Sequence, residues 1–352
     1  MNHHLALTLG MWLTAALPVA ANWVPATGNL ANLPSECGNL CQVFPVPNSA
    51  RVIAGVAGAG LWVSRDGGAE WTKLGDGGEV AIRNRPQQIL FDPANPETFW
   101  EVGIYTGPGV VKTTDGGRTF RALGGISHHD SLGIDFSDPR RATLLATGHE
   151  ARQKLWQSTD GGATFRELGA NLPADADLTS GCLVLDAKTY VVGCWGWRQP
   201  GGLWRTTDAG TNWTRVSDLT PARGAAILRT VKGALYCGSE QGGRVLKGTS
   251  DGAQWTSVAA PGARRVAPIE LPGGVIATLG KDAILISGDE GATWKTVAPG
   301  LPIPPGNGIT VGGLAYHATA KAAYVWFWDC GKVVLPDAIQ RWDFVRPPNP
   351  AD

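Results

Sequence analysis

The stretch SRDGGAEW, residues 64–71, places a serine, an aspartate, two glycines and a tryptophan in one short segment. Related segments recur along the chain: TTDGGRTF at 113–120, STDGGATF at 158–165, TTDAGTNW at 206–213, TSDGAQW at 249–255 and SGDEGATW at 287–294. Their aspartates are spaced by roughly 40 to 50 residues, which indicates a repeat protein. A repeat of that length built from short strands is typical of β-propeller blades.

Each repeat contains four short runs of strand-like residues. The third repeat shows them in order: SLGIDFSDP at 131–139, ATLLATGHE at 142–150, KLWQSTD at 154–160 and ATFREL at 163–168. Glycine, proline or aspartate separates the runs, as expected for turns between β-strands. No helical pattern of useful length follows the first 21 residues. The sequence therefore predicts an all-β fold made of four-stranded antiparallel units.

The repeated run Ser/Thr-x-Asp-x-Gly-x-x-Trp/Phe resembles the Asp box, or BNR repeat, of sialidases, the sortilin ectodomain and related propellers. The resemblance covers residues 50–300 and implies a turn between the third and fourth strands of each blade. In such a turn the carboxylate accepts backbone N–H groups, a glycine takes a positive φ, and the aromatic ring packs between blades. The fifth segment has one residue fewer between Asp251 and Trp255, so we expect a less regular turn there.

Six such segments do not set the number of blades. Residues 311–321, 322–330 and 338–345 supply three more strand-like runs after the sixth segment. The stretch NWVPATGNL at 22–30 resembles TWKTVAPGL at 293–301, which is a predicted fourth strand. We therefore predict a seven-bladed β-propeller of residues 22–352, closed when residues 22–27 complete the sheet begun by 312–345. Such closure leaves no open sheet edge.

The chain has 352 residues with 30 basic and 30 acidic side chains, so its formal net charge is zero. This balance argues against a nucleic acid or an anionic membrane surface as a partner. Residues 1–21 are predicted to be a signal peptide, because Leu5 to Leu17 is apolar and small residues precede Asn22. We expect a secreted or periplasmic protein without stable membrane insertion after cleavage.

All six cysteines follow residue 21, and export would permit disulfides. Two pairings are candidates: Cys182 with Cys194 on adjacent strands of blade 4, and Cys330 with Cys37 or Cys41 at the ring closure. Cys237 is expected to stay a buried thiol. No cysteine or histidine spacing resembles a metal site, so we expect neither a metal nor another cofactor.

In a propeller of this connectivity, the loops between second and third strands share one face with the links between blades. The repeated aspartate turns lie on the opposite face and are expected to be structural. Function is therefore expected around the central channel on the first of these faces. The candidate catalytic residues there are Tyr105, His128, His129, Asp130, His149 and Glu150. The candidate substrate-binding residues are Arg83, Arg85, Arg152, Trp195, Trp197, Arg198, Glu240, Arg244, Asp282 and Asp329.

These residue types fit acid–base work on a sugar. A neutral imidazole beside a carboxylate acts as base or acid, and guanidinium groups bind carboxylates. Two carboxyl groups are the requirement of a glycosidase, and Trp195 and Trp197 offer rings for stacking on a sugar face. The plainer interpretations are solvated loop residues for the charged groups and packing between blades for the tryptophans.

The Asp-box resemblance implies three functional classes. The leading hypothesis is an exported glycoside hydrolase acting on a poly- or oligosaccharide, as in the xyloglucan-cleaving family-74 hydrolases. One alternative is a polysaccharide lyase that uses His, Tyr and Arg around a uronate. The other is a binding or assembly propeller without catalysis, because this fold does not decide function.

Overall fold

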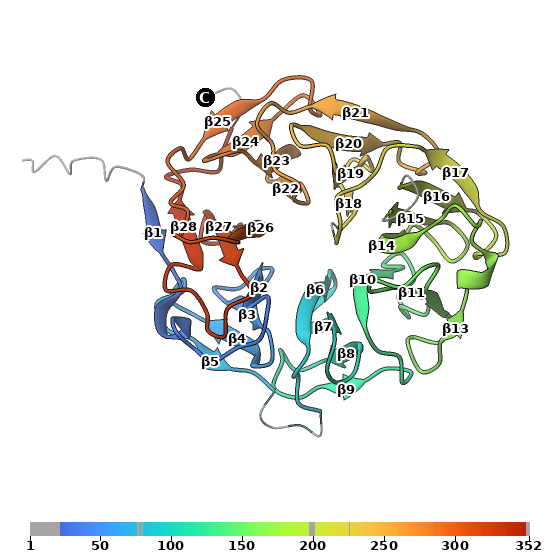
Figure 1. The fold of residues 1–352 in the computed structure, drawn as a ribbon, viewed down its shortest axis with the longest axis horizontal. Coiled ribbons are helices and arrows are strands. Elements are labelled where there is room, and N and C mark those ends of the chain that lie inside the picture. The colour runs from blue at the N-terminus through green and yellow to red at the C-terminus, as the bar shows by residue number, and fades with distance from the viewer. Residues whose placement is uncertain (1–21, 76–77, 79, 197–200, 225, 350–352) are drawn as a thin grey trace, which may run out of the picture.

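The computed structural model describes residues 22–75, 78, 80–196, 201–224 and 226–349. Within these ranges, seven four-stranded antiparallel sheets follow one another around a ring, which confirms the predicted seven-bladed β-propeller (Figure 1). The strands nearest the axis are β2, β6, β10, β14, β18, β22 and β26.

Six blades are built from four consecutive strands each. Blades 1 to 3 consist of β2 (Leu40–Pro45), β3 (Val52–Val56), β4 (Gly60–Ser64), β5 (Thr72–Lys73); β6 (Arg85–Asp92), β7 (Asn95–Ile104), β8 (Val110–Thr113), β9 (Arg121–Ala122); and β10 (His129–Ile134), β11 (Leu144–Gly148), β12 (Leu155–Ser158), β13 (Arg166–Glu167). Blades 4 to 6 consist of β14 (Leu178–Val184), β15 (Tyr190–Trp195), β16 (Gly202–Thr206), β17 (Thr214–Ser217); β18 (Leu228–Arg229), β19 (Leu235–Gly238), β20 (Arg244–Gly248), β21 (Trp255–Ala259); and β22 (Ile269–Leu271), β23 (Val275–Leu279), β24 (Ile284–Ser287), β25 (Lys295–Val297).

Blade 7 takes strands from both ends of the chain. It consists of β26 (Thr310–His317), β27 (Ala322–Trp328), β28 (Ile339–Asp343) and β1 (Trp23–Pro25). In the described residues, the helical content is two 3₁₀ turns, η1 (Gly28–Leu30) and η2 (Gly169–Asn171). None of the described helices is long and apolar enough to cross a membrane.

Apolar side chains between neighbouring blades form the core. Strands β3 and β11 are buried along their whole length because another blade lies on either side of them. Within the described ranges, seven clusters of buried residues each lie at one interface between blades. The aromatic residue of each repeated segment packs against the preceding blade, as expected; these residues are Trp71, Phe120, Phe165, Trp213, Trp255 and Trp294.

The repeated turn is held by its hydroxyl and carboxylate. In blade 1, Ser64 Oγ donates to Asp66 Oδ1 at 2.7 Å and accepts the Gly68 N–H at 2.8 Å. Asp66 Oδ1 also accepts the backbone N–H groups of Ala69 and Glu70. The hydrogen bond from Glu70 is the main reason that the pKa of Asp66 is lowered. In the shorter fifth turn, Thr249 instead accepts an N–H five residues ahead, from Gln254.

The ring is closed by pairing between the two ends of the chain. Strand β1 pairs with β28, with Trp23 opposite Trp342, so the predicted closure is confirmed. Nearer the axis, Gly38 N–H donates to the Asp329 carbonyl at 2.8 Å. The Cys37–Cys330 disulfide joins the same two segments across 293 residues of sequence, and it is one of the pairings predicted for Cys330.

The predicted Cys182–Cys194 pairing is wrong. In the β14–β15 ladder, Cys182 lies opposite Val192 and Cys194 lies opposite Thr179. The two cysteines are therefore diagonal neighbours, and diagonal positions are about 7 Å or more apart, beyond normal disulfide geometry. Both are buried free thiols, as are Cys41 and Cys237, and all four lie in the described part of the chain. Burial raises the pKa of Cys182 to about 12.

Reduction of the Cys37–Cys330 disulfide is expected to lower the free energy of unfolding by about 2–5 kcal/mol, because the bond restricts the unfolded chain. Thermal unfolding with and without a reductant measures the effect. The Cys37→Ser, Cys330→Ser double variant should melt at the lower temperature in both conditions. A reductant that shifts the melting of this variant as much as that of the natural chain would contradict the assignment.

Candidate active site

The loops on one face of blades 2 and 3 bring three rings together. Tyr105 lies between β7 and β8, His128 in the link before β10, and His149 between β11 and β12. The ring centroids are 5.4 Å apart for Tyr105 and His128, 5.5 Å for Tyr105 and His149, and 4.9 Å for the two histidines. We call these three residues the ring cluster. Tyr105 is its exposed member, with 49% of its surface accessible.

The backbone around the ring cluster is strained. Tyr105 and His128 have φ values of 70° and 72°, and Glu150, next to His149, has a φ of 49°. Left-handed backbone is unfavourable for residues with a Cβ, above all for a bulky side chain. Such residues persist where the surrounding structure holds them, and they are concentrated at functional sites.

Asp130 and His149 form a buried dyad. His149 Nδ1 lies 2.7 Å from Asp130 Oδ1, and both side chains are more than nine-tenths buried. An ionised carboxylate accepts a hydrogen bond, so Nδ1 donates to Asp130 and Nε2 is the nitrogen left to meet a ligand. Among the described residues, Nε2 has no hydrogen-bond partner, and it lies 3.8 Å from Glu150 Oε2. The dyad therefore presents an oriented imidazole nitrogen between Glu150 and the other two rings of the cluster.

His128 is held in its neutral form. Its Nδ1 accepts the backbone N–H of Tyr105 at 3.0 Å, which a protonated imidazole cannot do. Desolvation is the main cause that lowers the pKa of His128, and neighbouring His149 lowers it further. The bond fixes the Tyr105 loop against the link that precedes β10.

Arg223 completes this side of the site, and the sequence analysis missed it. Its guanidinium forms an ion pair with Glu150 and lies 5.2 Å from the centroid of a Trp195 ring. The hydrogen bond from Arg223 is the main cause that lowers the pKa of Glu150. Arg223 lies in the link between blades 4 and 5, and in the sequence it resembles any other arginine of a polar loop.

His129 lies apart from the ring cluster. Its side chain is fully buried, its Nδ1 lies 3.0 Å from the Thr147 carbonyl, and its ring packs edge-on against Trp156 at 4.8 Å. The β10–β11 ladder has a register shift between His129 and Ser131, so Asp130 is the extra residue of a bulge. Bulges redirect side chains, and His129 and Asp130, although neighbours in the chain, have different surroundings.

The predicted binding residues divide between the site and other places. Arg152 pairs with Asp177 at 2.8 Å beside the dyad, and Glu240 pairs with Arg265 at 2.7 Å further around the same face. Arg85 stacks over Trp328 at 4.7 Å, and Asp329 accepts a hydrogen bond from Asn39, so both belong to the closure region. Arg83, Arg244 and Asp282 are exposed and do not join the ring cluster, and Trp197 and Arg198 lie outside the described residues.

A second residue that sequence reasoning missed is Glu101. It is fully buried in β7, and burial raises its pKa to about 8. Asn84 Nδ2 donates to Glu101 Oε2 at 3.2 Å. This carboxyl group is neutral near pH 7 and lies in the wall between blades, not in the ring cluster.

A cavity of about 700 Å³ follows the axis of the ring. Its walls come mainly from the innermost strands and the links that precede them, and Asp130 and Arg223 contribute to it. Asp130 therefore belongs both to the dyad and to the channel wall.

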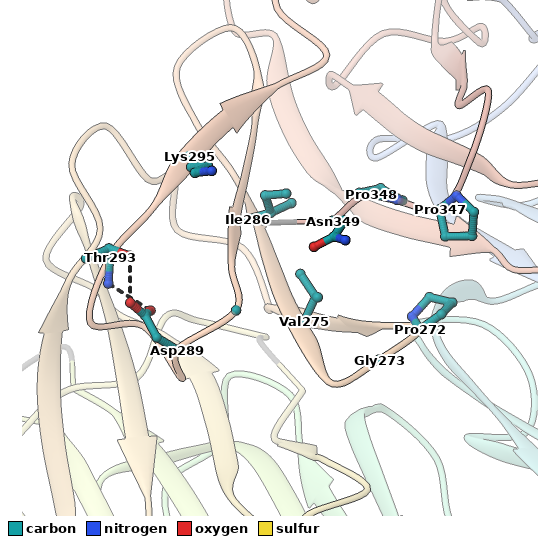
Figure 2. Close-up of a pocket in the computed structure, with 11 residues that line it drawn as sticks. Pro272, Gly273, Val275, Ile286, Asp289, Thr293, Lys295, Pro347, Pro348 and Asn349 are labelled. Atoms are coloured by element: carbon teal, nitrogen blue, oxygen red, sulfur yellow. Dashed lines mark hydrogen bonds between the residues drawn. The ribbon is translucent and has the colours of Figure 1, made fainter. Parts of the chain in front are cut away.

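A second cavity, also about 700 Å³, lies at the repeated turn of blade 6 against residues 347–349 (Figure 2). Its carboxylate, Asp289, already accepts the N–H and hydroxyl groups of Thr293 at 2.9 and 2.6 Å. The carboxylate is thus used to hold the turn. Neither here nor at any other place in the described ranges is a group of three or more His, Cys, Asp and Glu residues arranged to hold a metal ion.

No known protein family and no curated protein matches this sequence. Among solved structures, the extracellular domain of a putative one component system, BT4673 from B. thetaiotaomicron, superposes with a TM-score of 0.63 at 12% identity, covering 94% of this chain and 44% of that one. The GH74 xyloglucanase from Xanthomonas campestris gives 0.58 at 18%, covering 92% and 56%, so this chain spans little more than half of its length. YCF48 bound to D1 peptide gives 0.57 at 15%, covering 94% and 97%. At these identities the likeness shows the fold alone.

His129 is expected to make the protein less stable in acid. Burial is the main cause that lowers its pKa from 6.5 to about 4, so the unfolded chain takes up the proton first as the pH falls. The free energy of unfolding that neutral His129 contributes is fully present above pH 6.5. It is lost as the pH falls from 6.5 to about 4, by about 3 kcal/mol in total.

Denaturant unfolding at a series of pH values measures this effect. The His129→Phe variant should lose part of the pH slope, whatever its stability at neutral pH. Parallel pH profiles for the variant and the natural chain would contradict the assignment.

Proposed function

We propose that this chain is an exported carbohydrate-active enzyme whose general base is His149. The observation that carries the proposal is the 2.7 Å bond between Asp130 and His149, which leaves Nε2 buried without a hydrogen-bond partner in the described residues and 3.8 Å from Glu150. A sugar bound against the rings of Tyr105 and His128 would approach this nitrogen. Trp195 and Tyr105 would provide ring surfaces for the sugar.

The geometry favours elimination over hydrolysis. A glycosidase needs one protonated carboxyl group and a second carboxylate across the bond that breaks. Glu150 has its pKa lowered by Arg223, Asp130 is engaged by His149, and Glu240 is paired with Arg265. These carboxylates are poorly suited to donate a proton. Glycoside hydrolysis therefore becomes the alternative, and a lyase acting on a uronate-containing glycan becomes the first proposal.

In the proposed reaction, His149 Nε2 takes the proton from C5 of the uronate. The C4–O bond breaks, its electron pair stays on the leaving oxygen, and a C4=C5 double bond forms. Tyr105 Oη would give the leaving oxygen its proton, and Arg223 would balance the charge on the carboxylate.

Two further proposals accompany this function. We infer that the repeated turns are Asp boxes, which the hydrogen bonds of Ser64 and Asp66 support. We also propose export with residues 1–21 as signal peptide, which lie outside the described residues. The Cys37–Cys330 disulfide supports it, since disulfides persist mainly outside the cytoplasm. The likeness in fold to an extracellular domain agrees with the proposal of export.

The test is incubation of the purified protein with uronate-containing and neutral polysaccharides, followed by absorbance of the unsaturated product. We expect activity on a uronate polymer, and a loss of about 100-fold or more in His149→Ala, since a general base contributes about that much. Lys281→Gln, on the same face but outside the ring cluster, is the control and should retain activity and melting temperature. New reducing ends without unsaturation would identify a hydrolase, and binding without turnover a binding module; either result would refute elimination.

A further inference from the structure

Beyond Asp130 and Arg223, which the proposed chemistry uses, the central channel carries further charged groups. Its wall includes three arginines, Arg223, Arg229 and Arg265, and two carboxylates, Asp130 and Glu270. Asp130 binds His149, and Glu270 accepts the backbone N–H of Val231 at 2.8 Å. The three guanidinium groups of the wall outnumber these two carboxylates.

Two of these arginines are oriented from outside the channel. Arg223 is held by Glu150, and Arg265 by Glu240 at 2.7 Å, and neither of these glutamates belongs to the channel wall. Each guanidinium carries five N–H donors, so one carboxylate partner leaves donors to spare. Both arginines precede innermost strands, β18 and β22, and so lie at the same end of the channel as Asp130.

The rest of the wall suits a sugar ring. Phe44, Phe91 and Phe136 contribute half-buried aromatic surface, and Gln42 and Gln88 contribute amide groups that both donate and accept. Ligand sites are commonly cavities of this size with apolar walls and a few polar groups. The ring closure keeps this wall in place without any ligand.

We propose that the central channel is a binding site for a carboxylate-bearing sugar unit, held at its mouth by Arg265, while Arg223 serves the carboxylate of the reacting unit. The proposal rests on the proposed function, and it adds a subsite beyond the unit that reacts at His149. Because Asp130 belongs to both the dyad and the channel wall, a glycan in the channel continues directly to the reacting centre. The enzyme would thus select acidic over neutral glycans through the channel and not only through the chemical step.

The test is binding of short saturated oligomers of galacturonate, glucuronate and mannuronate, with neutral cello-oligosaccharides of equal length for comparison. Calorimetry on the His149→Ala chain avoids turnover. At least one uronate series should bind more tightly than the neutral series. Arg265→Gln should weaken that binding about ten- to a hundredfold, because a hydrogen bond to a charged group is lost. Ala267→Trp, which fills the channel, should weaken it as well.

Lys281→Gln removes a charge from the same face outside the channel, in the exposed turn between β23 and β24, and should bind as the parent does. Equal affinity for uronates and neutral oligomers, or equal binding by the Arg265 and Lys281 variants, would overturn the channel site. Uronate binding that needs Arg265 but is never followed by turnover would refute elimination and keep the channel site. If Arg265→Gln and Ala267→Trp both leave turnover unchanged, the channel site is refuted and elimination is kept.

Discussion

The pairing of β1 with β28 is the constraint on which the rest of the structure depends. Each blade buries its central strands only because another blade covers both of its faces, so an open row of blades would expose two apolar surfaces and two sheet edges. Blade 7 removes them by joining strands from opposite ends of the chain. The disulfide and the contacts of Asn39 with Asp329 and Val333 secure the same junction nearer the axis.

The candidate site inherits its geometry from this ring. Tyr105, His149 and Arg223 come from three different blades or links, and no local segment holds them together. The blades fix their positions, and the bond from Tyr105 N–H to His128 fixes the loops against each other. The unfavourable φ values of Tyr105, His128 and Glu150 are tolerated because the rigid sheets on either side hold the loop ends.

Charge at the channel mouth is arranged in pairs across the rim. Arg152 with Asp177, Glu150 with Arg223, and Glu240 with Arg265 each join two different loops. Exposed ion pairs contribute little to stability, so the pairs of Glu150 with Arg223 and of Glu240 with Arg265 matter more for orienting the guanidinium groups than for holding the blades together. The pairing also explains why Glu150 is a poor proton donor, and it links the acid–base site to the channel.

Much of the architecture could be predicted from the sequence because it depends on local patterns. The blade unit followed from the spacing of Asp66 and its equivalents and from the strand-length runs between them. The number of blades and the closure of the ring followed from the likeness of residues 22–30 to 293–301. The dyad could be named only as a group of candidates: His129 and Asp130 are neighbours in the chain, yet the strand buries one beside Trp156 and turns the other toward His149. Nothing in the sequence around Arg223 indicated a functional role. The predicted Cys182–Cys194 disulfide was wrong because two positions in the sequence do not determine the register of two paired strands. Local periodicity thus determined the fold, whereas the contacts between blades, set by twist and packing around the whole ring, decided which side chains meet.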